Sequence, residues 1–230
     1  MSKWLNNMER YSINRQKDLT EEQKQIIVGT LLGDGFIQKR GNSYRLKLKH
    51  SQGQLRYMLW KLDRLQPFFD LEPHIETSIC RGKHQKSCYA YSLAQKDLVT
   101  FHSLFYDITG RKIITPDLID YLTPLSIAVW YMDDGSIESN GRIRIYSNSF
   151  SKEENEVLSR LLQEKFDISL IPHSKFEKKY NRYYWYLLGK KDSSKKFIDL
   201  VYSHIVPSMQ YKVSNTRNDY TPENAVAFKI

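Results

Sequence analysis

Two apolar segments of helical length stand out in the chain, "IIVGTLLGDG" ending at Gly35 and "LSIAVWYMDDG" ending at Gly135. A capping box of Thr20 and Gln23 marks the start of the first helix, and Thr123 followed by a proline marks the start of the second. Nearly every position between these signals is apolar, which predicts two buried helices. The first helix is expected to run to Gly35, in the left-handed conformation common after helix ends.

The same order of patterns follows each apolar segment. Alternating runs, "SYRLKLKHS" and "GRIRIYSNS", predict strands with one basic and one apolar face. An amphipathic helix, a second strand pair rich in basic and aromatic residues, and a closing helix with a proline turn come next. The chain is therefore predicted to be an α+β protein with duplicated αββαββα repeats and pseudo-twofold symmetry. The predicted divisions are an N-terminal extension at 1–19, a first repeat at 20–110, a linker at 111–122 and a second repeat at 123–230.

The charge of the chain indicates what kind of partner the protein binds. The 35 Lys and Arg residues exceed the 26 Asp and Glu residues, which gives a net charge of +9 and an isoelectric point near 9.3. Such an excess, spread over both halves of the chain, is typical of proteins that bind a polyanion, most often nucleic acid. A basic protein without such a partner is the alternative on charge alone.

Other classes of protein are disfavoured by what the sequence lacks. The chain has no apolar run of 18 residues and no apolar stretch near its start, so we expect no membrane partner and an intracellular protein, in a bacterial cytoplasm or an organelle. Its two cysteines do not form a disulfide framework. Cys80, His84 and Cys88 have the spacing of metal ligands, but a fourth ligand is missing, so zinc is disfavoured.

The matched helix ends carry the candidate chemistry. Asp34 and Asp134 each precede a glycine at the end of an apolar helix, where the helix dipole disfavours a carboxylate by about 0.3–1 kcal/mol unless a cation is bound. If the two helices pack side by side through small residues such as Gly29 and Ala128, their ends bring several oxygen ligands together. Oxygen ligands favour Mg²⁺ over zinc. The alternative is that both aspartates only hydrogen-bond at helix ends.

These residues resemble a known family. "IVGTLLGDG" and "IAVWYMDDG", with basic strands after each, look like the two motifs of a single-chain LAGLIDADG homing endonuclease. The resemblance implies that Asp34 and Asp134 bind the divalent metal, Mg²⁺ with Mn²⁺ as a substitute, and that the carbonyls of Gly33 and Asp133 assist. It also suggests Lys112 and Lys212 as basic residues beside the scissile phosphate.

The resemblance further implies two central motif helices packed together and a saddle of two antiparallel sheets on double-stranded DNA, bound by a monomer that is often intron-encoded. Basic and polar side chains of the predicted strands are the candidate DNA contacts, namely Gln38, Arg40, Arg45, Lys47, Lys49, Arg81, Lys83, Arg142, Arg144, Tyr146, Asn148, Lys175, Lys179 and Arg182. The tyrosines and Trp185 of the second strand pair are expected to pack rather than stack on bases.

The predicted function is site-specific hydrolysis of one phosphodiester in each DNA strand. Metal ions at Asp34 and Asp134 would lower the pKa of a bound water and stabilise the leaving oxygen, so no protein nucleophile is needed and His50 and His102 are not required as bases. The first alternative is an RNA maturase that assists folding of its host intron RNA, with or without DNA cleavage. The second is a transcription regulator on the same fold, which the two repeats leave no room for.

Overall fold

Each half of the chain contains a four-stranded antiparallel sheet and its own helices. The structure is a computed structural model that describes residues 17–80 and 83–214. The chain divides into two compact units, Met1–His102 and Ser103–Ile230, so the division falls inside a helix, α4 (Leu98–Phe105). The repeat boundaries and the linker of the sequence analysis remain an interpretation beside this division.

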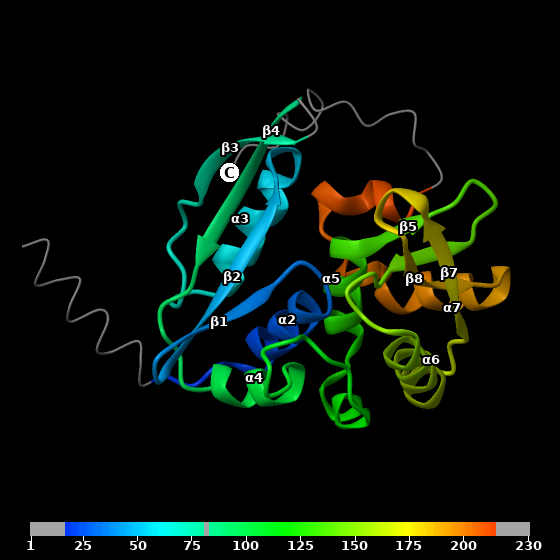
Figure 1. Cartoon of the computed structure of the whole chain (residues 1–230), viewed down its shortest axis with the longest axis horizontal. Helices are drawn as coiled ribbons and strands as arrows, with labels where there is room; N and C mark the ends of the chain where they lie inside the picture. The colour runs from blue at the N-terminus through cyan, green and yellow to red at the C-terminus, as the bar shows by residue number, and fades with distance from the viewer. Residues whose placement is uncertain (1–16, 81–82, 215–230) are drawn as a thin grey trace, which may run out of the picture. The chain divides into compact units, whose positions relative to one another are not determined.

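The first described element of the first unit is a helix. The sheet of this unit consists of two strand pairs, and a second helix lies between the pairs in the chain (Figure 1). Strand order in the sheet is β1-β2-β4-β3, with every neighbouring pair antiparallel. The elements are α2 (Glu21–Leu32), β1 (Phe36–Arg40), β2 (Ser43–Ser51), η1 (Gln52–Gln54), α3 (Leu55–Arg64), β3 (His74–Cys80) and β4 (Lys83–Tyr91).

The second unit repeats this order. Its sheet is ordered β5-β6-β8-β7 and is again antiparallel throughout. The elements are η2 (Pro116–Tyr121), α5 (Pro124–Asp134), β5 (Gly135–Ile137), β6 (Ile143–Tyr146), α6 (Lys152–Phe166), β7 (Leu170–Glu177), η3 (Lys178–Tyr180), β8 (Arg182–Gly189), α7 (Lys191–Val201), η4 (Tyr202–His204) and η5 (Pro207–Lys212). The identical topologies confirm the predicted α+β fold with a duplicated αββαββα repeat.

Helix starts follow the predicted capping residues. The hydroxyl of Thr20 accepts a hydrogen bond from the backbone N–H of Gln23, whose side chain accepts one from the backbone N–H of Thr20. Thr123 and Ser126 form the same reciprocal pair at the start of α5. Each box satisfies backbone donors that the first helical turn leaves without an intrahelical partner, which explains why both boundaries can be located from sequence.

The end of the first helix differs from the prediction. α2 ends at Leu32, because Gly33 leaves the helical region with φ −99° and ψ −128°, so Asp34 lies beyond the last turn. Gly35 is not left-handed either. A Cβ at Gly35 would lie 2.4 Å from the Thr30 methyl carbon and 2.7 Å from the Thr30 carbonyl oxygen, so glycine is required by a close approach and not by a positive φ.

Burial divides each sheet into two faces. In the first unit, Ile37, Leu46 and Leu48 are at most 1% exposed and lie on the face that α3 covers with Tyr57 and Met58. In the second unit, the corresponding buried positions are occupied by side chains that include Ile143, Ile145 and Leu187, and α6 packs against β7 and β8. The opposite faces carry polar, basic and aromatic side chains. The alternation predicted for β2 is therefore confirmed residue by residue.

No helix among the described residues is long and apolar enough to cross a membrane.

Gly35→Ala is expected to destabilise the protein by about 1–3 kcal/mol, because the new methyl group must displace Thr30, including its backbone. Gly53→Ala is the matched control in the same unit: the nearest atom to its Cβ is the Ser51 hydroxyl at 3.9 Å, so this variant should be neutral or slightly stabilised. Urea denaturation of both variants measures the difference. Equal stabilities would show that the close approach at Gly35 can relax without cost.

Candidate functional site

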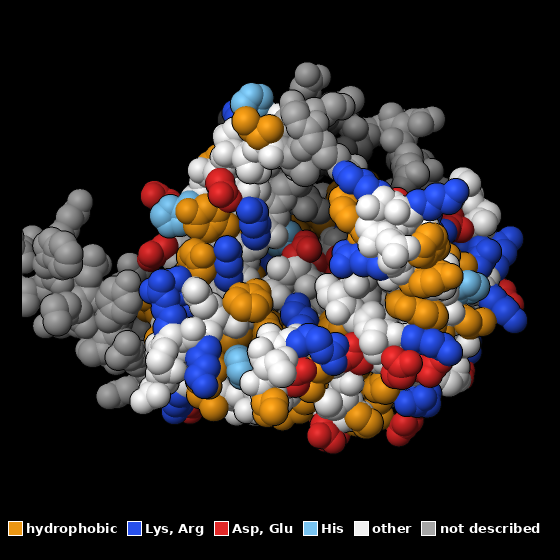
Figure 2. All heavy atoms as spheres, viewed as in Figure 1, with side chains coloured by type: hydrophobic (Ala, Val, Ile, Leu, Met, Phe, Trp, Pro, Cys, Tyr) orange, Lys and Arg blue, Asp and Glu red, His pale blue; other side chains and the backbone are white. Residues whose placement is uncertain are grey.

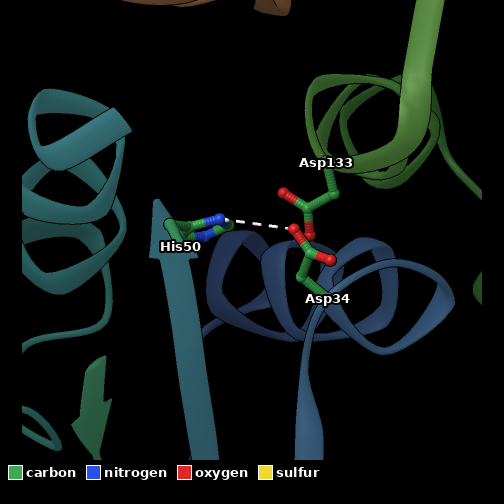
Figure 3. Close-up of side chains that lie close together, drawn as sticks. All are labelled: Asp34, His50 and Asp133. Carbon is green, nitrogen blue, oxygen red and sulfur yellow. Dashed lines mark ion pairs between the residues drawn. The ribbon is translucent and has the colours of Figure 1, made fainter. Parts of the chain in front are cut away.

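The acidic residue of the first motif lies at the junction between α2 and β1. The carboxylate of Asp34 is 42% exposed and faces the imidazole of His50 on β2, with 3.4 Å between Oδ2 of Asp34 and Nδ1 of His50 (Figure 3). The two side chains come from positions 16 residues apart, which the pairing of β1 with β2 brings together. Asp34 therefore lies just beyond the helix end instead of in its last turn, beside a residue to which the sequence analysis assigned no role.

His50 is a buried polar group on the apolar face of β2. It is 4% exposed, its ring centroid lies 5.1 Å from that of Tyr57, and neither ring nitrogen has a hydrogen-bond partner among the described residues. Leaving a buried polar group unsatisfied costs about 1–3 kcal/mol. The sequence contained a signal for this residue, because the alternation of β2 places a histidine at a position otherwise reserved for apolar side chains.

The second motif ends inside its helix, and a buried lysine closes that helix end. Asp133 and Asp134 are the last residues of α5, and the side chain of Asp133 leaves its final turn (Figure 3). Nζ of Lys212, a residue only 9% exposed, donates a 2.8 Å hydrogen bond to the carbonyl oxygen of Asp133. A cation at this position complements the negative end of the helix dipole. The structure thus brings Lys212 and Asp133, both predicted from sequence, into direct contact.

Tyr131 holds Lys212 from the other side. Its buried hydroxyl donates a 2.8 Å hydrogen bond to the backbone carbonyl of Lys212, and burial raises the pKa of Tyr131, so the hydroxyl keeps its proton. The Tyr131 ring also lies against Gly135, because a Cβ at Gly135 would be 2.1 Å from the ring. The sequence analysis missed Tyr131, because its role depends on residues 81 positions apart.

Lys112, the other candidate lysine, belongs to the second unit. It is half-buried and forms an isolated antiparallel bridge with Tyr106 before η2 begins. Its role beside the scissile phosphate stays a prediction.

The exposed face of the first sheet alternates cations with tyrosines. The guanidinium carbon of Arg45 lies 3.9 Å from the ring centroid of Tyr91, and Nζ of Lys47 lies 5.2 Å from the same centroid and 5.8 Å from that of Tyr89. Lysine and arginine side chains follow β1 and β2 across this face (Figure 2). Such cation–π contacts hold long side chains in place at about 0.5–1 kcal/mol each at exposed sites.

Polar partners add to this order. Nε of Arg45 donates a 2.8 Å hydrogen bond to Oε1 of Gln38 on the neighbouring strand, and Lys49 forms a 2.9 Å ion pair with Glu76 on β3. The hydrogen bond from Lys49 lowers the pKa of the Glu76 carboxyl. Four of the residues predicted to contact DNA in this unit therefore lie on one face of the sheet, namely Gln38, Arg45, Lys47 and Lys49.

The second sheet carries the same arrangement. The guanidinium carbon of Arg144 lies 4.6 Å from the centroid of Tyr186 and 5.8 Å from that of Tyr146, and Arg144 also pairs with Glu138. Arg182 lies 4.3 Å from the centroid of Tyr184. In both sheets, an arginine on the second strand after the motif (β2 or β6) therefore rests on a tyrosine of the last strand (β4 or β8).

The remaining predicted contacts are scattered around these rows. Arg142 precedes β6, and its Nε donates a 3.1 Å hydrogen bond to the carbonyl of Gly189, so its backbone is not in the strand where the alternation placed it. Arg81 and the side chain of Lys83 lie outside the described residues. The others are exposed but lie on different elements, namely Arg40 at the end of β1, Asn148 after β6, Lys175 within β7 and Lys179 in η3.

Four tyrosines lie under the basic side chains of the two sheets: Tyr89 and Tyr91 of β4, and Tyr184 and Tyr186 of β8. Their spacing of two residues within β4 and β8 is the signal, because it places them on one face of a strand. The zinc spacing gains no support. Cys88 is buried, its thiol donates to the carbonyl of His50, burial raises its pKa, and Cys80 has no described side chain.

The two units have identical topology, and each has an acidic residue near the end of an apolar helix and a basic exposed sheet face. These features are typical of an enzyme that acts on nucleic acid and is built from two repeats. The family model described as the LAGLIDADG DNA endonuclease family matches residues 24–197. The chain therefore belongs to this family, and the predicted class of DNA endonuclease is confirmed at that level.

Some curated relatives match this chain over most of their own length, and others match it over about half of their length. The cytochrome b mRNA maturase bI2 of Debaryomyces hansenii is 30% identical over 210 residues, which cover 88% of this chain and 78% of the relative. The probable intron-encoded endonuclease 1 of Wickerhamomyces canadensis is 30% identical over 216 residues, 85% of each chain. The chain spans only about half the length of other curated relatives it matches, such as the RecA protein of Mycobacterium gastri at 51%.

Among solved structures, the homing endonuclease I-WcaI bound to its DNA recognition sequence superposes with a TM-score of 0.77 over 93% of both chains. At 24% sequence identity this likeness shows a shared fold.

Tyr131→Phe is expected to destabilise the protein by about 1–2 kcal/mol, because the carbonyl of buried Lys212 loses this donor while packing is retained. Tyr202→Phe is the matched control, since Tyr202 is 57% exposed in the same unit. Thermal and urea denaturation of the two variants should separate them. A Tyr131→Phe protein as stable as the control would show that the hydrogen bond to Lys212 contributes nothing measurable.

Proposed function

We propose that this protein is a site-specific endonuclease that hydrolyses one phosphodiester in each strand of a long double-stranded DNA site. The carrying observation is the repetition, within one chain of the LAGLIDADG family, of a basic and aromatic sheet face behind each acidic motif. A binding protein needs only the sheets. The acidic residue at the end of each motif, Asp34 just after α2 and Asp134 as the last residue of α5, would add the hydrolytic function.

Each sheet face would bind one half of the DNA site. Antiparallel strands fit the major groove, where arginine and lysine recognise guanine and hold phosphates. The tyrosines beneath Arg45 and Arg144 hold both guanidinium groups before DNA arrives, which lowers the entropy lost on binding. One chain with two such faces can act as a monomer.

The residues at the motifs fit a divalent metal ion. Asp34 is a half-exposed carboxylate beside a buried imidazole that has no hydrogen-bond partner in the described part of the chain, and Asp133 and Asp134 present further carboxylates at the end of α5. Asp34 and Asp134 would hold Mg²⁺ or Mn²⁺, with the carbonyls of Gly33 and Asp133 as additional oxygen donors. When bound, such an ion lowers the pKa of a water molecule and stabilises the leaving oxygen.

The lysines would supply the remaining charge. Lys212 is fixed at the end of α5 by its hydrogen bond to Asp133 and by Tyr131, so its ammonium group can stabilise negative charge on the scissile phosphate without reorganising. Lys112 is the corresponding candidate from the sequence resemblance.

The direct test is selection of cleaved molecules from a randomised duplex library in the presence of Mg²⁺ or Mn²⁺. The expected outcome is one long site cut in both strands. Recovery of no cleaved duplex with either ion would overturn the proposal.

A second candidate function follows from one specific observation, the 30% identity to the Debaryomyces hansenii protein named a cytochrome b mRNA maturase. In this reading the chain assists splicing of an intron RNA, with or without DNA cleavage. A splicing assay with the intron that carries the gene tests it independently of the duplex selection. Both activities can reside in one chain, so a positive result in each assay is compatible with the other.

Asp34→Asn and Asp134→Asn are each expected to abolish double-strand cleavage while DNA affinity stays within about tenfold, because carboxylates that hold metal do not read bases. Gel shifts and cleavage assays on the selected site measure both properties. Asp63→Asn, an exposed aspartate on α3, is the matched control and should cleave normally. Full double-strand cleavage by either motif variant would contradict the metal assignment.

Substitutions in one sheet should reduce sequence specificity in only one half of the DNA site. Arg45→Ala with Lys47→Ala is expected to lose specificity in one half and Arg144→Ala with Arg182→Ala in the other, by about 1–3 kcal/mol for each side chain that reads a base. Lys195→Ala with Lys196→Ala removes the same charge from α7 and serves as the control. Footprints and selected-site profiles decide the matter: uniform weakening across both halves by either double variant would argue against one half-site per sheet.

A further inference from the structure

The first motif has a feature that a site built from oxygen ligands does not require. His50 is 4% exposed, both of its ring nitrogens lack a hydrogen-bond partner among the described residues, and its Nδ1 faces the Asp34 carboxylate at 3.4 Å (Figure 3). We propose that His50 is a nitrogen ligand of the divalent metal held by Asp34, so that this half of the metal site favours Mn²⁺ over Mg²⁺. The proposal rests on the proposed function and names a ligand beyond it.

The geometry suits two ligands of one ion. Metal–ligand bonds of about 2.0–2.2 Å place neighbouring ligand atoms about 3 Å apart at right angles and somewhat farther apart at wider angles. The separation of 3.4 Å between Nδ1 of His50 and Oδ2 of Asp34 lies in that range. The pair does not have hydrogen-bond geometry, since Nδ1 is among the buried atoms without a hydrogen bond, so a simple His–Asp hydrogen bond does not explain the arrangement.

The surroundings fix the imidazole in this position. His50 is paired in register with Cys88 of β4, whose thiol donates to the His50 carbonyl at 3.6 Å. The ring packs against Tyr57 of α3, with 5.1 Å between centroids. A buried imidazole held by packing, with its polar atoms unsatisfied, is pre-organised for a ligand that arrives later.

The choice of metal follows from the donor atom. Imidazole nitrogen suits Mn²⁺ and later transition ions better than Mg²⁺, which prefers oxygen and retains its water. The first two strands after the second motif, β5 and β6, contain no histidine. The preference is therefore a property of the Asp34 side, and the two acidic residues need not hold their ions equally well.

Electron paramagnetic resonance of bound Mn²⁺ tests the ligand directly. Electron spin-echo modulation of the full chain, free and in complex with the duplex selected above, should show coupling to a ¹⁴N nucleus, and ¹⁵N-histidine labelling should change its frequency. His50→Asn places an oxygen near the Nδ1 position, so this variant should still bind Mn²⁺ but lose the nitrogen coupling. His102→Gln, a half-buried histidine in the same unit, is the matched control and should retain it.

Metal titration supplies the second readout. His50→Leu should weaken Mn²⁺ binding by at least the roughly 10–100-fold seen when a supporting residue around a metal site is lost, while His50→Asn should narrow the preference for Mn²⁺ over Mg²⁺. Circular dichroism and thermal melts on each variant separate loss of a ligand from loss of the fold. If the His50→Leu protein melts at a lower temperature than the wild type, the spin-echo spectrum of the wild-type protein decides whether His50 is a ligand, because that measurement needs no variant.

The outcomes distinguish this inference from the proposed function. Wild-type protein that cuts DNA but shows no histidine nitrogen coupling, free or bound to DNA, overturns the role of His50 and leaves the endonuclease intact. Wild-type protein that shows the coupling but cuts no duplex supports His50 as a ligand and overturns the endonuclease. A preference for Mn²⁺ that persists unchanged in His50→Asn also contradicts the proposal.

Discussion

The close approach of a glycine to the preceding helical turn is the constraint on which both halves of this protein depend. A Cβ at Gly35 would lie 2.7 Å from the Thr30 carbonyl oxygen, and a Cβ at Gly135 would lie 2.1 Å from the Tyr131 ring. No other side chain fits either position without displacing its neighbour. Each apolar helix can therefore turn at once into the first strand of its sheet, and the aspartate before the glycine is placed at the junction of buried helix and exposed sheet.

From that junction the strands carry charge outward on one face only. Period-two alternation buries Leu46 and Leu48 and leaves Arg45 and Lys47 outside, on top of tyrosines from the partner strand. Long basic side chains normally lose conformational entropy when they bind phosphate or a base edge. Contact with an aromatic ring in the free protein removes part of that loss in advance, so the tyrosines act on binding without touching DNA themselves.

Near the motifs the protein keeps polar groups that folding alone would not favour. Lys212 is 9% exposed and His50 4%, and burial of such groups is unfavourable unless they are paired. Lys212 is paired through the Asp133 carbonyl, whereas the ring nitrogens of His50 have no hydrogen bond in the described part of the chain. One of these groups stabilises a helix end in the folded protein. The other is best explained by a ligand.

The sequence by itself determined everything that depends on local periodicity and capping. The capping box at Thr20 and the Thr123–Pro124 pair located the two helix starts, and alternation identified the buried and exposed faces of β2 and the duplicated order of elements. Only the tertiary structure decided where α2 ends, because steric contact with Thr30 sets the conformation around Gly35. The same holds for His50 beside Asp34, Tyr131 under Lys212 and the tyrosines under the arginines. Each of these contacts joins residues on different elements. Such contacts depend on how the elements pack, and the periodic pattern of the sequence carries no record of that packing.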